Sequence, residues 1–179
     1  MGAITLPPPA KLIAGILIHH PEERWDPLRQ RLTASLGPIE DVKEMGIFTK
    51  TRYYEKEMGT PLYRYFLSFA PLVRPETLPH IKYATNAIEA AFLNEQGGRT
   101  VNIDPGILTL QNLILATTKN YTHRIYLDKG IFADLTLIFQ KGEFQPLPWT
   151  YPDYRDAASR AFFLEVRNRY KIQLKEVLT

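Results

Sequence analysis

The sequence predicts an α+β fold, in which a ferredoxin-like βαββαβ half is extended by further antiparallel strands and followed by a C-terminal helix. Residues 11–104 show the order strand, helix, strand, strand, helix, strand, and a hairpin pattern and a final helical pattern come after it. With 179 residues, 45% of them hydrophobic, one domain over residues 1–179 is expected. An antiparallel or mixed sheet with helices on one face is the most economical arrangement.

The first unit is a strand followed by a helix. Residues 11–20, "KLIAGILIHH", form a near-continuous apolar run, which is typical of a central strand buried on both faces. Pro21 ends this strand. Asp26 and Pro27 resemble an N-cap and a first helical residue, and Gly37-Pro38 is the matching stop. The predicted helix has one apolar face, made by Leu28, Leu32 and Leu36.

The second unit contains two strands, a helix and a strand. A weak strand pattern covers residues 39–48, and "LYRYFLSFA" (62–70) is a stronger strand that Pro71 and Pro75 close. The helix that follows is expected to continue to Gly97-Gly98. Its apolar positions recur at helical spacing, at Leu78, Ile81, Ala84, Ile88 and Phe92. The strand "RTVNID" then leads into a predicted Pro105-Gly106 turn.

The last third begins with a strand at residues 113–117 and a hairpin whose turn is Asp128-Lys129-Gly130. Residues 144–156, "FQPLPWTYPDYRD", are expected to cross the molecule as an extended segment. A final helix follows, with one apolar side made by Phe162, Phe163, Val166, Tyr170, Leu174 and Val177.

Composition excludes several classes of protein. The chain has no cysteine, so it can form neither a disulfide nor a thiolate zinc site nor a cysteine nucleophile. No signal-peptide pattern and no membrane-length apolar run is present, which predicts a cytoplasmic protein without a membrane partner. The net charge of +3 and the pI of about 9.0 favour anionic ligands. "HHPEE" (19–23) could chelate a metal, but a polar strand end explains it better.

Several phrases occur together along the chain: "YYEKEMG", "LSF", "IKYATN", "VNIDPG", "TTKNYTHRIYL", "GIFADLTL" and "WTYPDY". Over residues 11–154 this combination resembles a bacterial domain-of-unknown-function family, numbered 4416, whose members often carry the label GTP-binding protein. The resemblance implies no established activity. The chain lacks a phosphate-binding G-x-x-x-x-G-K-[ST] loop, and Asn120 in "ATTKN" leaves no carboxylate to pair with a purine edge.

The charged stretch "TTKNYTHRIYLDKG" (117–130) interrupts apolar strands and could face a ligand. Lys119 and Arg124 are suited to a phosphate or carboxylate group, and His123 could act as a general acid or base. Asp134 lies on the same hairpin and is expected to pair with Arg124 or Tyr126. If these side chains instead belong to a solvated loop, the pair is a surface ion pair.

Asp104 precedes Pro105-Gly106, where it either starts the turn or points into a cleft as a catalytic group. We expect Lys119, His123 and Arg124 to converge with Asp104 on one concave site. Asp104 and Asp134 are also the candidate ligands for Mg²⁺, the one cofactor that we consider.

Three other elements contribute candidate ligand-binding residues, each with a structural alternative. Lys82, Asn86 and Glu89 form a polar stripe on the second helix, which a solvated face would also show. Tyr53 and Tyr54, with Arg64, offer aromatic walls and a charge, or simple core packing. In "WTYPDY", Trp149 and Asp153 could belong to a stacking lid, or Asp153 could cap the last helix.

Two functions remain open after this reading. The first is a protein that binds, or binds and acts on, a small phosphorylated or carboxylated ligand such as a nucleotide. The alternative is a non-catalytic RNA- or protein-binding module that uses exposed tyrosines and the basic side of the last helix. That side carries Arg160, Arg167, Lys171 and Lys175. Nucleic acid is the less favoured partner, and the oligomeric state is left open.

Overall fold

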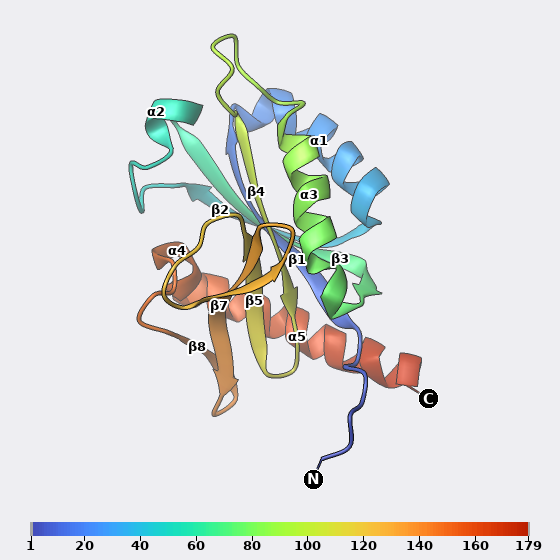
Figure 1. Ribbon diagram of the computed structural model, residues 1–179. Helices are drawn as coiled ribbons and strands as arrows, with labels where there is room; N and C mark the ends of the chain where they lie inside the picture. The colour runs from blue at the N-terminus through green and yellow to red at the C-terminus, as the bar shows by residue number, and fades with distance from the viewer. Residues whose placement is uncertain (1, 179) are drawn as a thin grey trace.

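The computed structural model describes residues 2–178 and contains one continuous antiparallel sheet (Figure 1). Over these residues the strand order is β2-β3-β1-β4-β5-β7-β6, with β8 paired to β7. The strands are β1 (Ala10–His19), β2 (Ile39–Ile47), β3 (Leu62–Val73), β4 (Val101–Leu108), β5 (Asn112–Thr117), β6 (Arg124–Asp128), β7 (Ile131–Gln140) and β8 (Glu143–Pro146).

The first four strands have the ferredoxin-like arrangement that the sequence predicts. Strand β1 pairs antiparallel with β3 on one side and with β4 on the other, and β2 pairs with the far side of β3. The apolar run therefore forms an inner strand, and the side chains of residues 10–18 in β1 are buried or, at Gly15, absent. Strands β5 to β8 extend this half beyond β4, so the predicted fold class is confirmed.

Helices cover both faces of the sheet, which corrects the expectation of helices on one face. The helices are α1 (Pro21–Leu36), α2 (Glu55–Met58), α3 (Leu78–Glu89), α4 (Pro152–Arg155) and α5 (Ala157–Leu178), with a 3₁₀ turn at Pro75–Thr77. Helices α1 and α3 lie on one face and α5 crosses the other (Figure 1). None of the helices within residues 2–178 has both the length and the apolar character needed to cross a bilayer.

Alternation along β1 explains the two covered faces. Leu12, Ala14, Ile16 and Ile18 pack toward α1 and α3, whereas Ile13 packs with Phe66 of β3 and the apolar side of α5. An inner strand that is apolar at consecutive positions needs a cover on both faces. Of the predicted apolar side of the last helix, Val177 is exposed, and the other five residues are buried.

Two helix boundaries differ from the sequence prediction. Helix α1 begins at Pro21, directly after His20 in a left-handed conformation, so Asp26 is not its N-cap and Pro27 lies inside it. Pro27 is exposed, and the carbonyl group that loses its helical partner can bind water. Helix α3 ends at Glu89 instead of near Gly97, because Asn94 closes a separate turn by accepting hydrogen bonds from the backbone of Gln96 and Gly98.

Three strand boundaries also differ. Strand β3 continues through Pro71 to Val73, and β8 forms inside the segment that was expected to be merely extended. Strand β4 runs straight through Pro105-Gly106, so these residues form no turn. Pro105 lies just before the residues of β4 that pair with β5, where the strand has one open edge and can accommodate a proline.

Gly15 generates a prediction about packing. A Cβ atom at this position of β1 would lie 2.3 Å from the Tyr154 hydroxyl and 3.1 Å from Nη1 of Arg64, both buried. Gly15→Ala should therefore lower the free energy of unfolding by about 1–3 kcal/mol, the usual cost of overpacking a core. Urea unfolding measures this, with Gly2→Ala as the matched control because a Cβ atom added at Gly2 would meet no described residue beyond its chain neighbours within 4 Å. Equal stability of the two variants would contradict the packing argument.

Candidate functional site

A fork between β4 and β5 creates the candidate site. The two strands pair only over Gly106 to Leu108, so the earlier part of β4 has a free edge. Two side chains of α3 form hydrogen bonds with that edge at Ile103. The Lys82 ammonium group donates to the Ile103 carbonyl oxygen (2.8 Å), and the Ile103 backbone N–H donates to the Glu89 carboxylate (2.7 Å). The polar stripe of α3 is therefore buried at Lys82 and Glu89 and is not a solvated face.

A pocket of about 320 Å³ occupies this fork, and we call it the fork pocket. Residues from α3, β4, the end of β5 and the segment before α2 line it. They are Tyr53, Tyr54, Lys82, Asn86, Glu89, Arg99, Asn102, Asp104, Thr117, Thr118, Lys119 and Tyr151. The sequence-predicted residues Lys82, Asn86, Asp104 and Lys119 thus line one hollow.

A second pocket of about 360 Å³ adjoins it, and we call it the aromatic pocket. The two pockets share Tyr53, Tyr54, Lys119 and Tyr151. The other residues that line the aromatic pocket are Phe48, Lys50, Thr51, Arg64, Arg124, Pro152 and Asp153. Both volumes lie within the range of small-molecule sites.

The structure brings together three of the four residues that were expected to converge. Lys119 and Arg124 line the aromatic pocket together, and Lys119 and Asp104 line the fork pocket together. His123 lines neither pocket. Its ring stacks on Trp149 with a 4.9 Å centroid separation, and its Nε2 atom lies 3.3 Å from Asp134. Trp149 also lies outside the two pockets, because its indole N–H donates to the Leu135 carbonyl.

Asp134 joins the two strands of the hairpin through ion pairs. It lies opposite Arg124 in the β6–β7 register, and its Oδ2 atom accepts a 2.9 Å hydrogen bond from Arg124 Nε. Asp134 is only 2% exposed, so the pair is not a surface ion pair. Arg124 and His123 both contact this carboxylate, which leaves it few free lone pairs for Mg²⁺. Residues 2–178 contain no group of three acidic or imidazole side chains placed to hold a metal.

Arg124 forms more hydrogen bonds and ion pairs within the protein than Lys119 does. Arg124 also donates to the Lys119 carbonyl and to the Tyr151 hydroxyl (2.7 Å), so its guanidinium group is committed to the protein. The Lys119 ammonium group donates to the Tyr53 hydroxyl (2.6 Å) and lies 4.5 Å from that ring's centroid. Among the residues that the structure describes, no carboxylate forms an ion pair with Lys119.

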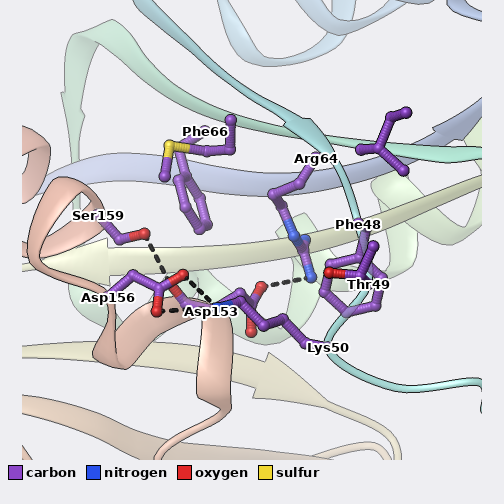
Figure 2. Close-up of a pocket in the computed structure, with 10 residues that line it drawn as sticks. Phe48, Thr49, Lys50, Arg64, Phe66, Asp153, Asp156 and Ser159 are labelled. Atoms are coloured by element: carbon purple, nitrogen blue, oxygen red, sulfur yellow. Dashed lines mark hydrogen bonds and ion pairs between the residues drawn. The ribbon is translucent and has the colours of Figure 1, made fainter.

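Arg64 and Asp153 form a buried ion pair at the floor of the aromatic pocket. Figure 2 shows Arg64 reaching from β3 toward Asp153 of α4, close to Phe48 and Phe66. The pair measures 2.7 Å, and the guanidinium group also faces the Phe48, Phe66 and Tyr154 rings. Asp153 therefore fastens α4 to the sheet and does not cap the last helix, which begins at Ala157.

Tyr54 and Tyr151 remain protonated near neutral pH. Burial raises the pKa of Tyr54 and of Tyr151 above the usual value. The hydrogen bond from Lys119 lowers the pKa of Tyr53, which is exposed. The rim shared by the pockets therefore offers phenol groups and one ammonium group to a ligand.

Sequence reasoning missed one part of the site, the network around Arg99. The Arg99 guanidinium group donates two hydrogen bonds to Glu57 of α2, at 2.7 and 3.0 Å, and single bonds to Glu89 and Asn102. Asn102 in turn donates to Asp104 (2.8 Å). The alternation of Asn102 and Asp104 in β4 was a signal that could have placed Asn102 on the same face as Asp104. Arg99 and Glu57 lie on irregular or very short elements and carry no such signal.

The basic side of α5 is partly committed to the protein. Arg160 pairs with Glu143 at 3.3 Å, and Arg167 lies over the Phe139 ring and donates to the Leu110 carbonyl. Arg160 and Arg167 are therefore less available to a nucleic acid than the sequence indicates.

These observations define an α+β protein with a ferredoxin-like half-sheet and a polar, ligand-sized cleft at a fork of the sheet. The chain belongs to the family described as a domain of unknown function, DUF4416, whose model matches residues 8–170. No curated protein and no solved structure matches the chain.

The Asp134–Arg124 pair generates the first prediction from this site. Asp134→Ala should lower the free energy of unfolding by about 3–5 kcal/mol, because it leaves a largely buried guanidinium group without its carboxylate. Urea unfolding of Asp134→Ala, Arg124→Ala and the double variant forms a cycle. Additive effects of the two substitutions would contradict the coupling.

The Glu57–Arg99 pair predicts an effect of pH. Hydrogen bonds from Arg99 lower the pKa of Glu57 below its ordinary value of 4.5. The stabilisation is therefore present above pH 4.5 and is lost as the pH falls through the folded-state pKa. Glu57→Gln should flatten the loss of stability in acid, by about 1 kcal/mol or less because the pair is partly exposed. Unfolding between pH 3 and 7 tests this, with Glu95→Gln at an exposed position as the control. A profile that Glu57→Gln leaves unchanged would refute the prediction.

Proposed function

We propose that this protein binds a small phosphorylated or carboxylated ligand that carries a planar ring, such as a nucleotide. The observation that supports the proposal most directly is that Lys119, a cation without an ion-pair partner among residues 2–178, lies on the rim shared by two ligand-sized pockets. A lysine in this setting has ammonium donors available for an anion.

The aromatic pocket supports the ring. Phe48, Tyr53, Tyr54 and Tyr151 supply its aromatic surface, and stacking on such side chains accepts any base because every base has a π face. The Arg64–Asp153 pair beneath it is internally neutralised, so this floor does not demand a charged ring. A nucleobase fits these conditions better than a second anionic group.

The roles within this proposal differ from those expected from sequence. Lys119 contacts the anion, whereas Arg124 holds Tyr151 and the backbone of Lys119 in place. Asp104 remains a candidate polar or catalytic group because it faces the fork pocket. His123 positions the hairpin through Asp134 and Trp149. We also propose a cytoplasmic location, where nucleotides are plentiful.

Titration calorimetry with nucleoside mono-, di- and triphosphates of the four common bases tests the proposal. Lys119→Ala should weaken the binding of whichever nucleotide binds by about 1.5–3 kcal/mol, the range for hydrogen bonds to charged groups, and should leave the unfolding free energy nearly unchanged. Lys171→Ala is the matched control, because it removes an exposed lysine of α5.

Two results would reject this function. The first is the absence of binding by every nucleotide in the series. The second is an equal loss of affinity in Lys119→Ala and Lys171→Ala, which would indicate general attraction to a basic surface. Binding of RNA that depends on Lys171 and not on Lys119 would favour the alternative module.

A further inference from the structure

We propose that the ligand has two parts, and that the fork pocket holds a neutral, hydroxylated group joined through the anion to the ring in the aromatic pocket. The chemical class that meets this description is a nucleoside diphosphate linked to a sugar. This inference rests on the proposed function and adds the second half of the ligand.

Charge in the fork pocket argues against a second anion there. Apart from Lys119 on the rim, which binds the first anion, the cations that line this pocket are committed: Lys82 to the Ile103 carbonyl and Glu89, and Arg99 to Glu57 and Glu89. Asp104 also lines the pocket, and within the described chain its carboxylate accepts one hydrogen bond, from the Asn102 amide. Lys82 and Arg99 are therefore balanced by Glu89 and Asp104 in the lining, so no positive charge is left over to attract a second phosphate group.

The same groups are suited to hydroxyl groups. A hydroxyl donates one hydrogen bond and accepts others, so a site with both carboxylates and amides satisfies it. Asp104 has acceptor capacity left. The Asn86 side-chain amide has no hydrogen-bond partner within residues 2–178, and it lines the fork pocket. Thr117 and Thr118 add hydroxyl groups on the opposite side of the fork.

The position of Lys119 orders the parts of the ligand. Lys119 lines both pockets, and so do Tyr53, Tyr54 and Tyr151. An anion bound by its ammonium group therefore lies between the aromatic pocket and the fork pocket and not at the end of either. In a nucleoside diphosphate sugar the charged diphosphate likewise lies between the nucleoside and the sugar.

Affinity for paired probes tests the inference. The probes are UDP, ADP and GDP, each compared by calorimetry with UDP-glucose, ADP-glucose and GDP-mannose on the full chain. At least one sugar ester should bind tenfold or more tightly than its own diphosphate. Asn86→Ala should remove that gain and leave the affinity for the diphosphate unchanged. Asn168→Ala, an exposed asparagine of α5, is the matched control.

Each outcome decides the inference. Diphosphates that bind through Lys119 while their esters bind no more tightly would overturn it and leave the proposed function standing. A tighter ester whose gain survives in Asn86→Ala would place the sugar outside the fork and also overturn it. If neither diphosphates nor esters bind, the inference fails, and the proposed function fails as well only if the mono- and triphosphates also do not bind. Alanine is a better helix former than asparagine, so Asn86→Ala is expected to fold.

Discussion

The free edge of β4 is the constraint on which the site depends. A buried backbone N–H or C=O group without a partner destabilises a fold, so the edge at Ile103 must be satisfied where no strand reaches it. Lys82 and Glu89 supply those hydrogen bonds from α3. They keep α3 against the strand and leave the fork open, because a neighbouring strand would have filled the space that the pocket occupies.

Glu89 connects this edge to the rest of the site. It accepts a hydrogen bond from Arg99, which also holds Glu57 of α2, and the Tyr53–Tyr54 segment precedes that short helix. Burial raises the pKa of Glu89, and Arg99 and Lys82 oppose that shift by favouring the charged form. One hydrogen-bond network therefore connects the edge of β4, the turn after α3 and the tyrosine rim. Loss of one partner in this network leaves the groups that it bonds without a hydrogen bond.

Two residues of β1, Gly15 and Lys11, connect the opposite end of the site to the sheet. Gly15 of β1 leaves room for the Tyr154 hydroxyl and for Arg64, which pairs with Asp153 of α4. Lys11, also of β1 and fully buried, pairs with Glu40 of β2 and donates to Gln173 of α5. Strand β1 thus departs from its apolar pattern at two positions, Gly15 and Lys11. Gly15 makes room for the Arg64–Asp153 pair that attaches α4, and Lys11 attaches α5.

The sequence alone determined the elements whose signals are local. The apolar run of β1, the apolar side of α5 and the turn at Asp128-Lys129-Gly130 follow from periodicity and turn chemistry. A cross-strand partner for Asp134 on the same hairpin also follows, although only the structure chooses Arg124 over Tyr126. The order of the first six elements was enough to predict the ferredoxin-like half-sheet.

Tertiary structure decided what depends on distant partners. Pro105-Gly106 resembles a turn locally, but pairing with β1 draws it into a strand. Arg99, just before β4, meets Glu57 of α2 and Glu89 of α3 through contacts between separate elements, which no spacing in the chain encodes. His123 has the residue type of a catalytic group, but packing places its ring against Trp149 and outside both pockets. A pattern along the chain predicts which face of its helix or strand a side chain occupies. A site requires that the faces of different elements meet, and only tertiary packing determines which faces meet.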